Sequence, residues 1–203
     1  MLLLSVAIVC VLSAVQCNPD LDAFKWHGVV PDVLSQLPEQ LLKITYDNRL
    51  MIMCGDIVTP TQVKNIPTVE WAADPDTYYT LAMVDPDAPS RSNHKLREFK
   101  HWLVVNIPGN NVAKGDAIAE YVGAGPPKDT GLHRYVLLLY SQPKKLTFSG
   151  SRVSNKSRRS RPKFHIKQFA DHHRLGQPIA GTLFLAEYDE YVPILNKQLS
   201  SGQ

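Results

Sequence analysis

Three stretches of the chain are apolar at nearly every position, which is typical of strands buried on both faces. They are residues 78–84 (YYTLAMV), 101–106 (HWLVVN) and 133–140 (HRYVLLLY). An Asp-Pro pair follows the first stretch and a Pro-Gly pair the second, and such pairs favour turns. Because side chains alternate along a strand, His133 and Tyr135 share one face and Arg134 lies on the other. The pattern predicts a β scaffold whose strands end in polar loops.

Weaker patterns occupy the rest of the chain. Residues 42–46 and 51–58 are predicted to form two further strands, and residues 25–50 also leave room for a short helix. The polar segment around His172 and His173 is predicted to be helical. These elements add organisation to the predicted scaffold but no chemistry.

Two loops carry the polar groups that could bind a ligand. Residues 85–91 (DPDAPSR) combine two carboxylates with two prolines, which fix φ and restrict the residues before them. Asp85 and Asp87 are therefore held in a stiff loop. Residues 122–127 (VGAGPP) contain glycines whose backbone N–H groups can approach a ligand closely and hold an anion. Together with the strand histidines, the loops predict a small polar pocket.

At these residues the chain resembles the phosphatidylethanolamine-binding protein family. Four segments carry the resemblance in the family's order and spacing: DPDAPSR, REFKHWLVVNIPG (97–109), YVGAGPPKDTGLHRYVLLLY (121–140) and AGTLFLAEYDEYVP (180–193). The resemblance extends over residues 25–200. It implies one mainly β (α+β) domain with a central antiparallel β-sheet, a smaller second sheet and a few peripheral helices. It also implies a pocket for phosphate-like and carboxylate anions, including phosphoethanolamine head groups.

The resemblance also assigns the ligand-binding residues. They are Asp85, Asp87, Pro89, His101, Gly125, His133 and Tyr135. The pocket rim departs from the animal intracellular members, which usually have Tyr, Trp and a second His around Leu96, Phe99 and Lys100, and a Tyr where this chain has Asn196. Arg134 is predicted to form a structural ion pair, and Asp87 has a second interpretation as a brace of its loop. A histidine of ordinary pKa, about 6.5, and a phosphate whose second pKa is about 6 both predict anion binding that strengthens as the pH falls from about 7.5 to about 6.

Each of these groups also has an ordinary structural explanation, since strand histidines are usually structural and Asp-Pro pairs usually form turns. The run VDPDA resembles the nucleophile motif of haloacid-dehalogenase-type phosphatases, which also needs a later Lys and an acidic pair. A zinc site would need closely spaced His or Cys residues; no such pair lies in the pocket motifs, and His172 and His173 belong to the polar segment predicted to be helical. Ser90 is the one candidate nucleophile in the pocket motifs. We expect a binding protein without a metal or cofactor, and not an enzyme.

The N-terminal region predicts secretion. Residues 2–15 (LLLSVAIVCVLSAV) are apolar, and no charged side chain precedes Asp20. The stretch suits a signal peptide better than a membrane span, which needs about 20 apolar residues. Cleavage after Cys17 would separate a signal peptide, residues 1–17, from a domain, residues 18–203, with Cys54 as its one cysteine. An uncleaved anchor is the alternative. Secretion also argues against the intracellular kinase-inhibitor role known in the family.

The most basic part of the chain is residues 152–167, with seven Lys or Arg and no acidic residue. This run produces most of the excess of 22 cationic over 19 acidic residues. It is predicted to be a solvated loop, and the alternative is peripheral contact with an anionic membrane surface. Asn155 begins the glycosylation sequon Asn-Lys-Ser, which a secretory route makes usable. Nucleic acid is not an expected partner of a secreted chain.

Two functions stay open. The first is a secreted protein that binds a small anionic or phosphate-bearing ligand, such as a phospholipid head group or an odorant-like molecule. The second is an extracellular interaction protein that blocks a receptor or a protease, as family members that inhibit serine carboxypeptidases do. The sequence does not identify a protein partner for the second function.

Overall fold

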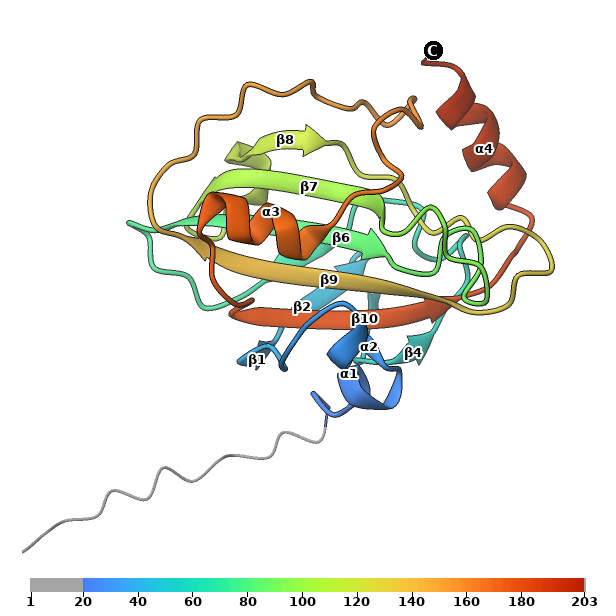
Figure 1. Cartoon of the computed structure of the whole chain (residues 1–203), viewed down its shortest axis with the longest axis horizontal. Helices are drawn as coiled ribbons and strands as arrows, with labels where there is room; N and C mark the ends of the chain where they lie inside the picture. The colour runs from blue at the N-terminus through green and yellow to red at the C-terminus, as the bar shows by residue number, and fades with distance from the viewer. Residues whose placement is uncertain (1–19, 203) are drawn as a thin grey trace, which may run out of the picture.

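The computed structural model describes residues 20–202, so the predicted signal peptide lies outside the described part. Within it, the chain forms a seven-stranded and a three-stranded sheet with short helices around them (Figure 1). The strands are β1 (Gln40–Leu41), β2 (Lys43–Tyr46), β3 (Leu50–Met51), β4 (Asp56–Ile57), β5 (Thr68–Glu70), β6 (Tyr78–Asp85), β7 (Phe99–Pro108), β8 (Asp116–Ala119), β9 (His133–Gln142) and β10 (Ala180–Ala186). The helices are α1 (Ala23–Trp26), α2 (Val29–Asp32), η1 (Val112–Lys114), α3 (Ile166–His173) and α4 (Val192–Ser200).

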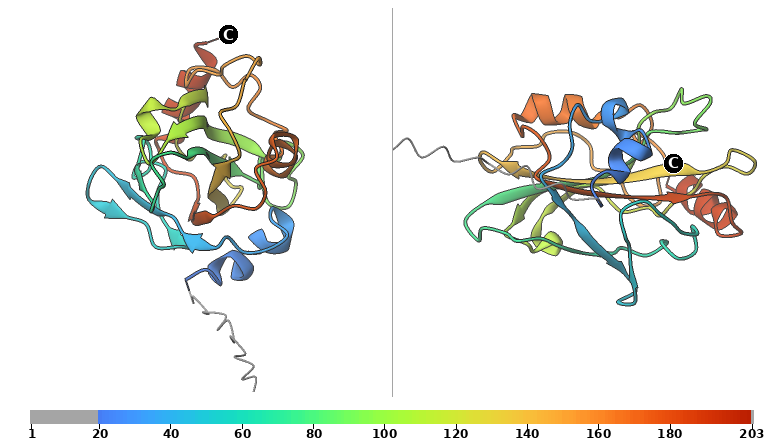
Figure 2. Two further views of the ribbon diagram at one scale, coloured as in Figure 1. Left: turned by 90° about the vertical axis from the view of Figure 1, so that its left-hand side faces the viewer. Right: turned by 90° about the horizontal axis from the view of Figure 1, so that it is seen from below.

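The large sheet is the middle layer of the molecule. Its strand order is β1-β10-β9-β6-β7-β8, and β4 also pairs with β10. Helices α1, α2 and α3 lie on one face, and the small sheet, β3-β2-β5, lies on the other (Figure 2). The central strands are therefore covered on both sides, which explains why their sequences are apolar at nearly every position.

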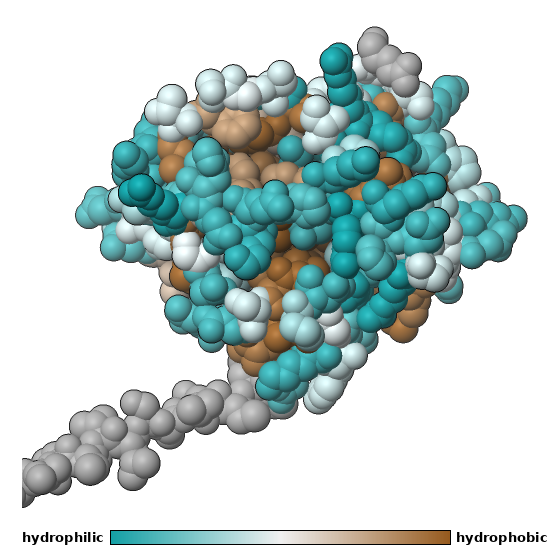
Figure 3. Space-filling model, in the orientation of Figure 1, coloured by the Kyte–Doolittle hydropathy of each residue, from teal (hydrophilic) through white to brown (hydrophobic). Residues whose placement is uncertain are grey.

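The alternation of side chains divides the core into two halves. Leu137 and Leu139 of β9 pack toward the small sheet against residues such as Ile44. Val136 and Leu138 pack toward the helices, where Ile166 of α3 joins them. On the face that carries α3, polar side chains dominate the surface, and apolar ones show in hollows between them and at parts of the rim (Figure 3). The three predicted main strands are confirmed, each with slightly wider bounds.

Two predictions about the sheet need correction. Residues 51–58 are not one strand, because a turn closed by hydrogen bonds between Met53 and Asp56 separates β3 from β4. Gly55 in this turn has a φ of +97°, which a strand does not allow. The large sheet is also not wholly antiparallel, because β1 and β4 pair with β10 in parallel. All the other pairings in the sheet are antiparallel, as expected.

Helix α4 lies apart from the other helices, beyond one end of the large sheet (Figure 1). Leu195 and Leu199 on its inner face pack against Ala88, Phe99 and Val122 in a small third cluster. The helix thereby closes the end of the sheet at which β6 ends and β9 begins. Within residues 20–202, no helix has the length and apolar character needed to cross a membrane.

Candidate functional site

A small pocket lies at this end of the sheet, beneath α4. Its volume is about 60 Å³. It is lined by Asp85, Ala88, Pro89, Leu96, Phe99, His101, Gly125, Pro127, His133, Arg158, Leu195, Asn196 and Leu199. Five of the seven predicted ligand-binding residues are in this lining, namely Asp85, Pro89, His101, Gly125 and His133. Segments far apart in the sequence therefore meet at one point, as the motifs predict.

A larger hollow of about 600 Å³ lies elsewhere, between β5 and strands β7 and β8. Its lining is mostly apolar and contains no histidine. Its one carboxylate, Glu70, is already paired with Lys43. The small pocket is the better candidate site, because the titratable groups gather there.

His133 and Asp85 form a buried hydrogen-bonded pair in the pocket floor. The Nδ1 atom of His133 lies 2.9 Å from Oδ2 of Asp85, and its Nε2 atom lies 2.9 Å from Oγ1 of Thr130. Thr130 donates its hydroxyl proton to the carbonyl of Pro127. Both ring nitrogens of His133 are thus engaged within the protein, and both oxygens of Asp85 are engaged as well, by His133 and by the backbone N–H of Asp87.

His101 is the second imidazole of the pocket and is a neutral ring. Its Nδ1 atom lies 3.0 Å from the carbonyl oxygens of Val122 and Gly123, so Nδ1 carries the proton. Burial lowers the pKa of His101 to about 4. The prediction of an ordinary pKa is therefore wrong for His101. Its Nε2 atom is left as a hydrogen-bond acceptor.

Gly125 and Tyr135 form a hydrogen bond with each other at the back of the pocket. The backbone N–H of Gly125 donates to the hydroxyl of Tyr135 at 3.2 Å, so it is not free to bind an anion. Tyr135 is fully buried behind the pocket and is not part of its lining. A Cβ atom at Gly125 would lie 2.8 Å from Leu195 of α4. A larger residue at this position would therefore require the end of the Leu195 side chain to move.

Asp87 is also outside the lining, on the opposite side of β9 from the pocket. Its Oδ2 atom accepts hydrogen bonds of 2.9 Å from both N and Nε of Arg134, and its Oδ1 accepts one of 2.6 Å from Nη2. Burial alone would raise the pKa of Asp87, but these bonds and the charge of Arg134 outweigh burial and lower it. Asp87 also donates its backbone N–H to Asp85 at 2.7 Å. These contacts match the interpretation of Asp87 as a residue that holds its loop in place. A direct contact between Asp87 and a ligand stays a prediction.

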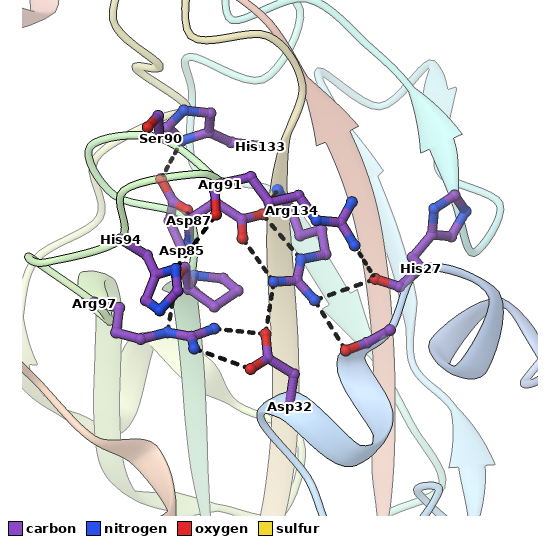
Figure 4. A network of polar contacts seen from close by, with 12 residues as sticks. His27, Asp32, Asp85, Asp87, Ser90, Arg91, His94, Arg97, His133 and Arg134 are labelled. Atoms are coloured by element: carbon purple, nitrogen blue, oxygen red, sulfur yellow. Dashed lines mark hydrogen bonds and ion pairs between the residues drawn. The ribbon is translucent and has the colours of Figure 1, made fainter.

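Arg134 extends this network to the N-terminal helices (Figure 4). Its Nη1 atom donates to the carbonyls of His27 and Gly28, and its Nη2 atom donates to Asp32. Asp32 also binds Arg97. Burial works against the ionised Asp32, but the hydrogen bonds from the two arginines lower its pKa to about 2. The predicted structural ion pair of Arg134 is confirmed.

Sequence reasoning missed the contribution of the basic run. Arg158 lines the pocket, whereas Arg161 is 0% exposed and donates only to backbone carbonyls. The expectation of a wholly solvated loop is therefore wrong. Lys100, expected at the rim, is not in the lining; it is buried with Nζ 4.8 Å from the centre of the Phe164 ring. The sequence alone carries no signal that separates these cations from their exposed neighbours.

Ser90, the candidate nucleophile, forms hydrogen bonds within its own loop. The hydroxyl of Ser90 lies 3.2 Å from that of Ser92 and accepts the backbone N–H of Asn93. Between residues 20 and 202, no group of three or more His, Cys, Asp or Glu residues is placed to hold a metal ion. The pocket offers a hydrogen-bonding surface that includes one cationic side chain, Arg158.

Comparison with known proteins identifies the family. The profile of the phosphatidylethanolamine-binding protein family matches residues 37–184. The chain is 43% identical over 171 residues to odorant-binding protein A5 of Drosophila melanogaster, covering 84% of this chain and 81% of that protein. It is 40% identical over 162 residues to a 26 kDa secreted antigen of Toxocara canis, covering 79% of this chain and 61% of the antigen.

A solved structure supports the same conclusion. The carboxypeptidase Y inhibitor, in complex with its cognate proteinase, superposes with a TM-score of 0.71 at 27% identity. The match covers 87% of this chain and 98% of the inhibitor. The chain belongs to the phosphatidylethanolamine-binding protein family.

Proposed function

We propose that this protein is an extracellular binding protein whose small pocket holds one anionic group, a phosphate or a carboxylate. The observation that carries the proposal is the set of polar groups in the lining. Arg158 supplies a positive charge, the neutral ring of His101 supplies a hydrogen-bond acceptor, and both oxygens of the one carboxylate, Asp85, are engaged by His133 and by the N–H of Asp87. The pocket therefore complements a single negative charge without a metal.

The size of the pocket limits what it can enclose. Pockets that bury drug-sized ligands measure about 300–1,000 Å³, far more than the 60 Å³ found here. An anionic head group fits this volume, and the remainder of a lipid or odorant-like ligand would extend from the mouth. The site residues of the pocket proper are then Asp85, Pro89, His101, Gly125 and His133, supported by Asp87 and Tyr135 from behind.

Secretion is part of the proposal. One relative is named a secreted antigen and another an odorant-binding protein, which supports an extracellular location. Asn155 is exposed, so it is accessible for glycosylation, and Cys54 is a free thiol. Protein collected from the medium should begin at Asn18 and carry a glycan at Asn155, and intact mass spectrometry measures both. Retention of residues 1–17 or an unmodified Asn155 would contradict the corresponding part.

The binding proposal is tested with two phosphate monoesters of equal size, propyl phosphate and phosphoethanolamine. At least one should bind the wild-type protein, as measured by calorimetry. His133→Ala should weaken binding by about tenfold or more, because the variant takes away the imidazole partner of Asp85 and leaves that carboxylate facing the anion. NMR titration of the wild type provides a second measurement, which does not depend on the folding of the variant. Shifts confined to the pocket support the proposal, and no binding of either ester overturns it.

A second candidate function is inhibition of a serine carboxypeptidase. The observation that favours it is the 27% identity to the carboxypeptidase Y inhibitor over most of the chain. Inhibition of carboxypeptidase Y by the wild-type protein and by His133→Ala would separate the two functions. Equal inhibition by both proteins would indicate a surface that does not include the pocket.

A further inference from the structure

The segment that carries Arg158 is held rigidly against the sheet by a buried arginine. All the polar nitrogens of Arg161 donate to backbone carbonyls, at distances of 2.8–3.2 Å. These carbonyls belong to Lys100, His101, Glu120, Ser154 and Ser157. Two of them lie on β7, at His101 and the residue before it. Arg161 therefore fixes residues 154–161 directly beside the pocket.

Arg158 lies at the mouth of the pocket and contacts its rim on two sides. Its backbone N–H donates to the carbonyl of Leu199 in α4. Its Nη2 atom donates to Oδ1 of Asn196 at 2.6 Å, and its Cζ atom lies 5.8 Å from the centre of the Phe99 ring. Leu199, Asn196 and Phe99 all line the pocket themselves. The position of the guanidinium is thus set by α4, by the aromatic wall and by its own backbone.

The contacts of Arg158 determine how a second charged group of the ligand would be accommodated at the mouth of the pocket. An ammonium group is bound in proteins by aromatic faces, carboxylates and carbonyl oxygens. The guanidinium of Arg158 already lies over the ring of Phe99 and donates to the side-chain carbonyl oxygen of Asn196. The one carboxylate of the lining, Asp85, is engaged by His133. A ligand ammonium at the mouth would find its acceptors taken and would face the like charge of Arg158.

We propose that Arg158 is the specificity-determining residue of the pocket, and that it selects anions without a neighbouring positive charge over zwitterionic head groups such as phosphoethanolamine. The inference rests on the proposed function, because it concerns the same pocket and its anionic ligand. It names the ligand class as monoanionic esters or carboxylates with a neutral substituent. Arg158 attracts the anion and repels the ammonium, so its effect on the two kinds of ligand differs in size.

The test compares propyl phosphate with phosphoethanolamine, which differ only in a terminal methyl or ammonium group. Calorimetry at one pH and low salt should show the wild type binding propyl phosphate about fivefold more tightly, the factor for one charge pair at 4 Å in water. Arg158→Gln should bring the ratio of the two affinities close to one. Arg159→Gln is the matched control, because this exposed neighbour has the same charge but does not line the pocket. It should keep the wild-type ratio.

The outcomes separate the two proposals. If the wild type binds both esters equally, or if Arg158→Gln and Arg159→Gln give the same ratio, the role of Arg158 is overturned while the pocket remains an anion site. If the wild type binds neither ester, the proposed function and the inference both fall. Arg158 is exposed, so its variant should fold, and an amide NMR spectrum that matches the wild type outside the pocket verifies this.

Discussion

His133 and Arg134 are neighbours in sequence at the start of β9, yet they lie in opposite kinds of polar environment. The guanidinium of Arg134 is surrounded by carboxylates and carbonyls that satisfy its donors within the protein. On the other face, His133 lies at the surface of a cavity and His101 keeps a ring nitrogen that can accept a hydrogen bond. The comparison shows that burial of a charged group is by itself no sign of a binding site. Unused hydrogen-bonding capacity beside a cavity is the better indicator.

The largest effect is expected from removing Arg134, which holds together the polar network on its side of β9. Arg134→Met should lower the free energy of unfolding by about 3–5 kcal/mol, because Asp87 would be left buried without its cation. Chemical denaturation followed by circular dichroism measures the loss. Arg91→Met is the control, since Arg91 is exposed and its side chain donates one hydrogen bond, to the carbonyl of His27. It should cost less than about 1 kcal/mol, and equal losses in the two variants would contradict the structural role of Arg134.

Glu98 can be compared with Asp87, because it is also a buried carboxylate but has no ion-pair partner among the described residues. Burial raises its pKa from 4.5 to about 7, although the N–H of Ile166 donates to it. A carboxyl with a raised pKa in the folded state stabilises the protein fully below its unfolded pKa. That contribution is lost as the pH rises through about 7, and it amounts to about 3 kcal/mol.

Glu98→Gln removes the titrating group and keeps an acceptor for Ile166. The difference in unfolding free energy between the variant and the wild type should therefore change in favour of the variant between pH 5 and pH 8, as measured by denaturation at both values. A difference that does not vary with pH would show that Glu98 titrates normally.

The pH dependence of binding tests the pocket side of β9, where His101 keeps a ring nitrogen that can accept a hydrogen bond. His101 is neutral above its pKa of about 4, so its Nε2 can accept the proton of a phosphate monoanion but repels the lone pairs of the dianion. Since the second pKa of a phosphate ester is about 6, propyl phosphate should bind about tenfold more tightly at pH 6 than at pH 7.5. The direction agrees with the expectation from sequence, but the titrating group is the ligand. Propyl sulfate, a monoanion at both values, should show no change, and a matching increase would place the titrating group on the protein.

The smallest effect is expected for Asp85→Asn. Because both oxygens of Asp85 are engaged within the protein, by His133 and by the N–H of residue 87, removing the carboxylate charge should change the affinity for propyl phosphate by less than about threefold. Asparagine can still accept the N–H of residue 87 and donate to Nδ1 of His133. Calorimetry at neutral pH provides the measurement. A tenfold gain in affinity would mean that Asp85 carries an unshared charge and repels the ligand.

The sequence by itself determined the main strands, the family and the residues that meet in the pocket floor. Apolar runs of the length of β6, β7 and β9 have few alternatives to a sheet covered on both faces, and the alternation of side chains assigns His133 and Arg134 to opposite faces. These are local or near-local properties, which a pattern along the chain records.

Only the tertiary structure decided which polar groups are free and which are engaged. Asp87 and the N–H of Gly125 are engaged by Arg134 and Tyr135, and the partner of each lies on another segment. Arg158 and Arg161 are three positions apart in one basic run, yet one lines the pocket and the other is buried against β7. Charge along the sequence does not distinguish them, because what a long side chain contacts depends on the distant segments that pack around it.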